Sequence, residues 1–333
     1  MSASSIQARP FRWQDAGRVV QFGRGALADA PELLGEGYTL LTTERARGAA
    51  PALVERAASV HQVPPGRVDE IAAALRGDVE GDLLVALGGG RVIDTAKALA
   101  AADPPRSVAA VPTTLSAAEM TWLHRHAAGV PAETSHVRPQ IVLNDPELSA
   151  SAPAPALAAS ALNALSHTAE ATMTTTANAI ATAVALAGAR LLVTGFEGDD
   201  PDRDSLALGA LLAGFAADAA GYGLHHVMAQ TLARYTAVGH AAANGILLPH
   251  TLRALARRFP IEMERFGEAI GEDPPSAAAR LTERIGTVRL RELGVTPEEL
   301  ATCADAALER PQLGLTPPPP DRAELLAIYE TAW

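Results

Sequence analysis

The chain has 333 residues, 48% of them hydrophobic and only 4% aromatic, which is typical of a folded protein with a core rich in alanine, leucine and valine. Its formal net charge of −11 disfavours nucleic acids and anionic membranes as partners. The single cysteine, Cys303, excludes an intramolecular disulfide and a cysteine-rich zinc site.

Strand and helix signals alternate along the first 150 residues. Short apolar runs predict strands at Val19–Phe22, Tyr38–Thr43, Leu83–Leu87, Val108–Val111 and Gln140–Leu143. Helical periodicity fills the segments between them, at Ala49–Gln62, Arg67–Leu75 and Val92–Ala102. Such alternation predicts an α/β domain, residues 1–150, with a Rossmann-like parallel sheet covered by helices.

The character of the sequence changes after the Pro/Ala/Ser-rich stretch Ser149–Pro155. Helical patterns then follow one another, at Ala156–Met173, Ala177–Val193, Ser205–Tyr222, Val227–Tyr235, His250–Arg258, Ser276–Leu293, Pro297–Ala307 and Arg322–Ala332. We therefore predict a second, all-α domain over residues 151–333. A secretion signal and a sufficiently long apolar span are both lacking, so a cytoplasmic protein without a membrane partner is expected.

Three consecutive glycines, Gly88–Gly90, stand between a predicted strand and a predicted helix that contains Lys97, the only lysine of the chain. Glycine permits close backbone approach, and a helix N-terminus offers unpaired N–H groups and the positive end of its dipole. The pattern therefore predicts a phosphate-binding turn. A merely tight β–α turn explains one glycine well and three poorly.

Glu44 follows the predicted strand Tyr38–Thr43, where an acidic side chain accepts hydrogen bonds from the ribose of NAD. Arg45 and Arg47 beside it suit the 2′-phosphate of NADP instead, and a solvated loop explains all three charges equally well. Both NAD(H) and NADP(H) stay open as cofactors, with NADH favoured.

Several polar side chains interrupt the alanine-rich helices of the second half. Asn163 and His167 are four residues apart and project from one helix face, while His225 and His226 follow a glycine-rich segment and precede His240. A single histidine is more often a core or surface residue than a ligand, but buried polar groups need partners. Spacing alone supports a shared site and separate structural roles equally.

Six blocks in order resemble the iron-containing alcohol dehydrogenase family, within the dehydroquinate synthase-like superfamily. They are LVALGGGRVIDTAK, VPTTLSAAEMT, VLNDPEL, ALNALSHTAEA, GLHHVMAQTLA and GHAAANGILLPH. The resemblance implies an α/β dinucleotide-binding domain followed by a helical catalytic domain, an NAD(P)-dependent activity on a small molecule, and assembly into a homo-oligomer, most simply a homodimer.

The resemblance also implies roles for individual residues. Gly88, Gly89 and Gly90 would hold the pyrophosphate, with Asp94 and Lys97 supporting that loop and Thr113 and Thr114 near the nicotinamide. The cofactor-binding set is therefore Gly88, Gly89, Gly90, Asp94, Lys97, Thr113, Thr114 and Glu44. The catalytic set is His167, His226, His240, Asn163 and His225.

Asn163 is the most informative of these positions. The family binds its metal through an aspartate and three histidines, which fall on Asn163, His167, His226 and His240. A neutral amide offers a dipole where a carboxylate offers a charge, so the affinity for iron or zinc is expected to fall. Asparagine here resembles the maleylacetate reductase branch, whose members reduce an enone with NADH or NADPH and no metal.

Three departures from the family bear on the substrate. Arg91 replaces a serine of the loop, Gln230 replaces a histidine, and residues 121–142 replace a longer segment with one that contains His124, Arg125, His126, His136 and Arg138. The leading hypothesis is a metal-independent NAD(P)H-dependent reductase of an enone or carbonyl on a small, carboxylated molecule. The alternatives are a cyclase or lyase with transient or no redox chemistry, a metal-dependent alcohol dehydrogenase, and a non-catalytic binding protein.

Overall fold

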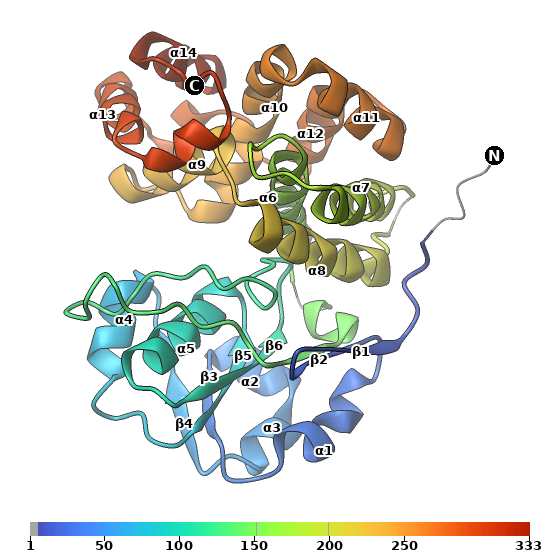
Figure 1. The fold of residues 1–333 in the computed structure, drawn as a ribbon, viewed down its shortest axis with the longest axis vertical. Coiled ribbons are helices and arrows are strands. Elements are labelled where there is room, and N and C mark those ends of the chain that lie inside the picture. The colour runs from blue at the N-terminus through green and yellow to red at the C-terminus, as the bar shows by residue number, and fades with distance from the viewer. Residues whose placement is uncertain (1–5, 151, 199) are drawn as a thin grey trace. The chain divides into compact units, whose positions relative to one another are not determined.

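A computed structural model describes residues 6–150, 152–198 and 200–333 (Figure 1). The chain divides into two compact units. The sheet unit comprises Met1–Ser151 and Arg203–Gly214, and the helical unit comprises Ala152–Asp202 and Phe215–Trp333. The predicted domain boundary falls at Ser151, which lies outside the described residues, and it stays a prediction.

The described part of the sheet unit contains a seven-stranded sheet in the order β1-β2-β7-β6-β5-β3-β4. Its strands are β1 Phe11–Asp15, β2 Arg18–Phe22, β3 Thr39–Thr42, β4 Ser59–Gln62, β5 Leu83–Gly88, β6 Ser107–Pro112 and β7 Ile141–Asn144. β1 and β2 form an antiparallel hairpin, and every other neighbouring pair is parallel. The predicted parallel α/β sheet is therefore confirmed.

Helices cover both faces of this sheet because alternate strand residues point to opposite sides. Leu84 and Ala86 of β5 pack on one face, with the helices α4 and α5, while Val85 and Leu87 pack on the other with α1, α2 and α3 (Figure 1). The helices of this unit are α1 Ala30–Leu34, α2 Glu44–Ala49, α3 Pro51–Glu55, α4 Val68–Leu75 and α5 Gly90–Ala102, with the 3₁₀ turns η1 Ala26–Asp29 and η2 Pro146–Ser149.

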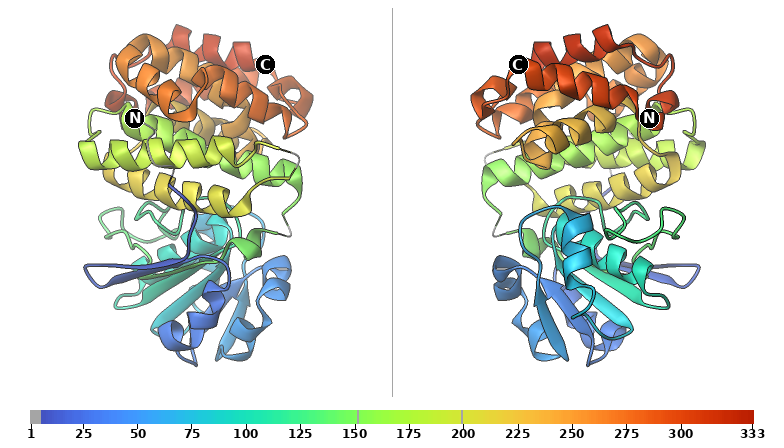
Figure 2. Two further views of the ribbon diagram at one scale, coloured as in Figure 1. Left: turned by 90° about the vertical axis from the view of Figure 1, so that its right-hand side faces the viewer. Right: turned by 90° about the vertical axis from the view of Figure 1, so that its left-hand side faces the viewer.

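In the helical unit, helices pack on helices (Figure 2). They are α6 Ala154–Thr172, α7 Ala179–Thr194, α9 Leu224–Tyr235, α10 His240–Arg258, α11 Pro260–Ile270, α12 Pro274–Glu283, α13 Pro297–Leu308 and α14 Arg322–Ala332, with η3 Leu290–Leu293 and η4 Pro311–Leu315. α8, Arg203–Ala220, begins in the sheet unit and ends in the helical unit. The sequence predicted this whole helix as part of the all-α domain, whereas Arg203–Gly214 belongs to the sheet unit.

Two predicted helices are wrong in part. The helix expected over Ala49–Gln62 ends as α3, and Ser59–Gln62 is instead the edge strand β4, whose half-exposed residues lack the apolar run that marks a buried strand. The helix expected over Ser276–Leu293 ends as α12 at Glu283, shortly before Gly286, which takes a positive φ of 86°. β1, α1, α2 and α11 were not predicted.

Helix α10 continues through Pro249, where a helix start was expected one residue later. Proline cannot donate a hydrogen bond to the carbonyl four residues before it, which here is Gly245. The Thr282 hydroxyl of α12 lies 2.9 Å from the Gly245 oxygen and 2.7 Å from the Ala278 oxygen, so its single proton is shared between the two. The long helix keeps His240 at its first turn.

Among the described residues, no single helix has the length and apolar character to cross a membrane, although the bent pair Arg203–Ala220 and Leu224–Tyr235 passes by length and composition alone.

Candidate functional site

The three glycines of the sheet unit form the turn from β5 to α5. Gly88 is the last residue of β5 and pairs with Pro112 of β6, and Gly89 caps α5 without a side chain. A Cβ on Gly88 would lie 2.6 Å from Val92, and one on Gly89 would lie 2.9 Å from the Thr114 hydroxyl. The first N–H groups of α5 are thus open to an anion at the carboxyl edge of the sheet.

Lys97 is fully buried on α5, and its amine is enclosed by oxygen atoms. The Nζ atom lies 2.8 Å from the Asp94 carboxylate and donates to the backbone oxygens of Ala118, Thr121 and Leu123 at 2.8–3.1 Å. Lys97 therefore supports the turn from behind, by holding residues 118–123 against α5. Its amine is not exposed to a ligand.

The other predicted cofactor residues lie at the same edge of the sheet. The Thr113 N–H donates to the Gly88 oxygen at 3.0 Å, and Thr114 packs on Gly89. Glu44 is exposed at the start of α2, directly after β3, and accepts a hydrogen bond from Gln62. Because ligands of parallel α/β sheets bind where the strands end, this arrangement suits a dinucleotide.

Glu119, which was not among the predicted site residues, is a buried carboxyl group in the segment 118–123 whose backbone oxygens bind Lys97. Its side chain is 1% exposed, and its Oε2 atom has no hydrogen-bond partner among the described residues. Burial raises the pKa of Glu119 to about 7, although Lys97 and Arg18 act in the opposite direction. The backbone oxygen of Glu119 accepts from Arg18 at 2.8 Å.

The segment over residues 121–142 brings its three histidines together. The ring centroids of His124, His126 and His136 lie 4.4–5.3 Å apart. Both His124 nitrogens are occupied, since Nδ1 donates to the Arg125 oxygen and Nε2 accepts from the Val137 N–H, each at 3.0 Å. Burial lowers the pKa of His124 to about 3, so this imidazole is neutral.

The predicted catalytic residues of the helical unit come from three helices. α6 begins with a proline in its first turn and places Asn163, His167 and Glu170 on one face, at spacings of four and three residues. α9 supplies His225 and His226, and α10 supplies His240. Ring contacts and hydrogen bonds link five of the side chains on these helices, those of His167, Glu170, His225, His226 and, through Asn244, His240.

Glu170 organises the start of α9. Its carboxyl group accepts from the backbone N–H of His225 at 2.7 Å and of His226 at 3.3 Å, and its Oε2 atom lies 2.6 Å from Nδ1 of His226. Burial raises the pKa of Glu170, against the effect of these backbone donors. Sequence reasoning missed Glu170, although it lies one turn after His167 in the quoted block ALNALSHTAEA.

A second chain of hydrogen bonds fixes His240. The Nε2 atom of His225 lies 3.1 Å from the amide oxygen of Asn244, and the Asn244 NH₂ group lies 2.8 Å from the His240 oxygen and 3.2 Å from its Nε2. Because an amide oxygen only accepts, His225 carries its proton on Nε2, and its Nδ1 faces the Thr251 hydroxyl at 2.7 Å. Asn244 was missed, although it follows His240 by one turn.

His167 and His226 stack face to face, with ring centroids 3.9 Å apart and planes 22° from parallel. Burial lowers the pKa of His225 and of His226 to about 3, and burial together with the neighbouring imidazoles holds that of His167 well below its usual value. All three rings are therefore neutral hydrogen-bonding groups near pH 7.

These side chains do not fit a metal ion in their present arrangement. An ion requires several free lone pairs that converge on one point, and donor atoms of this set are already engaged in other contacts. The Nε2 atom of His240 accepts from Asn244, and that of His226 lies 3.3 Å from the Ser166 hydroxyl. Across the described ranges, no three histidine, cysteine or acidic side chains are placed to share an ion.

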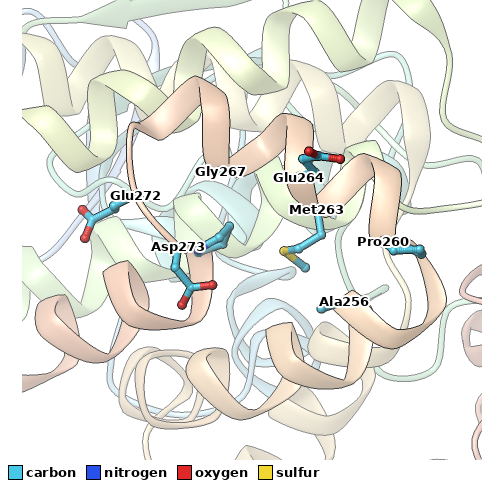
Figure 3. A pocket seen from close by; sticks show the side chains of 8 residues that line it. Ala256, Pro260, Met263, Glu264, Gly267, Glu272 and Asp273 are labelled. Atoms are coloured by element: carbon cyan, nitrogen blue, oxygen red, sulfur yellow. The ribbon is translucent and has the colours of Figure 1, made fainter.

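A groove of 540 Å³ lies elsewhere on the helical unit, between α10, α11 and α12 (Figure 3). Glu264, Glu272 and Asp273 border it, and Met263 points into it. Two of these acids already have structural roles, because Asp273 caps α12 and Glu272 pairs with Arg280. The groove holds no catalytic set comparable to the histidines.

Comparison with known proteins places the chain among characterised folds. A model described as the Fe-containing alcohol dehydrogenase family, C-terminal, matches residues 157–333. The maleylacetate reductase of Sphingobium indicum is 31% identical over 318 residues, which cover 88% of this chain and 89% of that protein.

Two solved structures share the whole fold. The maleylacetate reductase from Agrobacterium tumefaciens matches with a TM-score of 0.81 at 26% identity, covering 98% of each chain. An iron-containing alcohol dehydrogenase from Corynebacterium glutamicum matches with a TM-score of 0.83 at 29% identity, covering 94% of each chain.

Proposed function

This chain belongs to the iron-containing alcohol dehydrogenase family of oxidoreductases, and from that premise we propose that it is an NAD(P)H-dependent, metal-independent reductase. The substrate is a small carboxylated molecule with an enone or carbonyl group, and maleylacetate, an unsaturated oxo dicarboxylate, is the first candidate. One observation carries the proposal: the donor set at the family's metal position is neutral, stacked and already hydrogen-bonded.

The glycine turn fits the pyrophosphate of a dinucleotide. Side chains on Gly88 and Gly89 would collide with Val92 and Thr114, so the close approach of strand, helix and loop depends on their absence. The open N–H groups of α5 suit the two phosphates, and exposed Arg91 adds a positive charge in the first turn. Glu44 at the end of β3 favours NADH over NADPH.

His167 and His240 supply hydrogen-bond donors to the oxygen that becomes negative during reduction, because the N–H group of His225 is already bonded to Asn244 and both ring nitrogens of His226 already face Glu170 and Ser166. The bound nicotinamide supplies the hydride to the substrate carbon. Each neutral imidazole carries one N–H group, and such donors stabilise a developing enolate or alkoxide. The Asn244 contact leaves the proton of His240 on Nδ1, which makes this exposed side chain a donor.

Asn163 and Glu170 complete this interpretation of the site. Asn163, 6% exposed, contributes a neutral amide where a carboxylate would favour a cation. Glu170 fixes the orientation of the His226 ring through a contact of 2.6 Å. The expected homodimer and the cytoplasmic location stay proposals beside this activity.

Oxidation of NADH and NADPH, followed by absorbance with maleylacetate as substrate, tests the activity. Turnover is expected to persist after exhaustive treatment with a chelator. Loss of turnover that iron or zinc restores would contradict metal independence, and reduction of simple aldehydes alone would contradict the substrate class.

A pair of glycine variants tests the cofactor site. Gly89→Ala introduces a methyl group against Thr114, and overpacking costs about 1–3 kcal/mol, so KM for NADH is expected to rise about tenfold. Gly48→Ala, which meets no atom within 4 Å, is the matched control. Equal KM values for NADH in the two variants would contradict binding of the nucleotide at this turn.

A further inference from the structure

Gln230 lies one turn after His226 on α9 and shares its face of the helix. Side chains four residues apart on a helix are neighbours, with Cβ atoms about 6 Å apart. Within residues 224–232, all of which the structure describes, every side chain except that of Gln230 is buried. Among the imidazoles of the candidate site, His240 is exposed and His167 is half-buried, so a ligand can reach them from solvent.

The amide oxygen of Gln230 is bound to an arginine. Nη2 of Arg310, just before η4, donates to Oε1 of Gln230 at 2.9 Å, and Nε of Arg310 lies 3.3 Å from Oε1 of Gln312. Both partners are neutral amides. Among the described residues, no carboxylate lies within ion-pair distance of Arg310, and its Nη1 atom makes no hydrogen bond.

Arg258 is an example of an arginine with a purely structural role in this chain. Its two terminal nitrogens bind both carboxylate oxygens of Glu324, at 2.7 and 2.6 Å. Arg310 is half-buried with the same forked donors, but its charge is left without a counter-ion within the described residues. A planar guanidinium in that state is suited to a carboxylate, which it binds through two parallel hydrogen bonds.

We propose that Arg310, positioned by Gln230, binds a carboxylate of the substrate one helical turn from His226. This inference rests on the proposed function and specifies how its carboxylated substrate class is recognised. Glutamine suits the position because its amide oxygen accepts from the guanidinium at any pH. A histidine at position 230 would repel Arg310 whenever its ring was protonated.

The test compares an acid with its ester. Isothermal titration of the NADH-loaded protein with 4-oxopentanoate and with methyl 4-oxopentanoate presents the same ketone with and without the negative charge. Wild type is expected to bind the acid more tightly. Because a hydrogen bond to a charged group is stronger than one between neutral groups, Arg310→Gln is expected to weaken binding of the acid about tenfold to hundredfold and to leave binding of the ester unchanged.

Two further variants separate binding from folding. Gln230→Leu is expected to weaken the acid less than Arg310→Gln does, and Arg310→Lys is expected to recover part of the affinity. Arg265→Gln, an exposed arginine of α11, is the control without effect. Thermal unfolding of each variant checks that the chain is folded.

Equal loss of acid and ester binding in Arg310→Gln would overturn the subsite, as would a wild type that does not prefer the acid. A protein that reduces uncharged enones with NADH and shows no such preference keeps the proposed reductase and loses only this subsite. Failure to bind or oxidise NADH would instead contradict the proposed function.

Discussion

Lys97 in the sheet unit and Glu170 in the helical unit are both fully buried ionisable side chains, and opposite backbone groups enclose them. Lys97 is bound by backbone oxygens and a carboxylate, whereas Glu170 is bound by backbone N–H groups and an imidazole. Neither side chain is exposed to a ligand. Each holds the segment that carries the site.

The difference lies in what each shell requires. Every partner of Lys97 is an acceptor, so only a cation with several donors satisfies them together. The shell of Glu170 is mixed, because His225 donates an N–H group while Nδ1 of His226 can accept a proton. An amide reproduces most of that second pattern and loses only the 3.3 Å hydrogen bond from the backbone N–H of His226, whereas no neutral side chain of similar length reproduces the first.

Lys97→Met removes the cation from the sheet unit and has the largest expected effect. The backbone oxygens of Ala118, Thr121 and Leu123 lose their donor together, and each buried acceptor left unpaired costs about 1–3 kcal/mol. Urea denaturation measures the loss against Arg67→Met, which breaks only an exposed pair with Asp69. A cost of about 1 kcal/mol or less, as for a surface pair, would contradict the comparison.

Glu170→Ala and Glu170→Gln sharpen the second half of the comparison. Alanine leaves the N–H of His225 and the His226 ring without partners, at an expected cost of about 2–3 kcal/mol. Glutamine accepts from His225 and donates to Nδ1 of His226 but cannot accept from the backbone N–H of His226, so its cost is expected to be about 1 kcal/mol. Thermal unfolding measures both, with exposed Glu264→Ala as control. Equal losses in the two variants would show that Glu170 must be ionised.

Glu119→Gln probes a buried carboxyl beside Lys97 and has the smallest effect, confined to one pH range. Its pKa is raised from 4.5 to about 7, so the folded chain retains a proton that the unfolded chain releases. The stability that this proton gives is complete below pH 4.5 and is lost as the pH rises through about 7.

The variant has no such loss, so its stability relative to wild type is expected to be about 2 kcal/mol greater at about pH 8 than at about pH 5. Urea denaturation at the two pH values measures the difference, and Glu268→Gln on the exposed face of α11 is the control. The same difference at both pH values would show that Glu119 does not titrate in this range.

The sequence predicted what local pattern determines. Strand, glycine turn and helix at residues 83–102 follow one another along the chain, and the structure forms them there. The resemblance grouped Asn163, His167, His226 and His240 as one site, and this grouping stays a prediction, although the rings of His167 and His226 do stack. β4 was not predicted as a strand, because an edge strand with one exposed face has no continuous apolar run.

The partners of buried groups were harder to predict. Lys97 was expected to support the phosphate-binding turn, but its backbone acceptors lie 21–26 residues further along the chain, in a segment without regular secondary structure. Glu170 and Asn244 each lie one turn from a predicted histidine, so their positions were available but their partners were not. Tertiary packing, not sequence spacing, decides which buried polar groups meet.

One consequence of burial concerns the chemistry of the proposed substrate. Enones and ketones are electrophiles that react with amines and thiols. The chain has one lysine and one cysteine, and both side chains are fully buried, with the pKa of the Cys303 thiol raised to about 12 by burial. The folded protein therefore presents neither a lysine amine nor a cysteine thiolate to such a compound. The substrate that it is proposed to reduce cannot alkylate either side chain while the chain is folded.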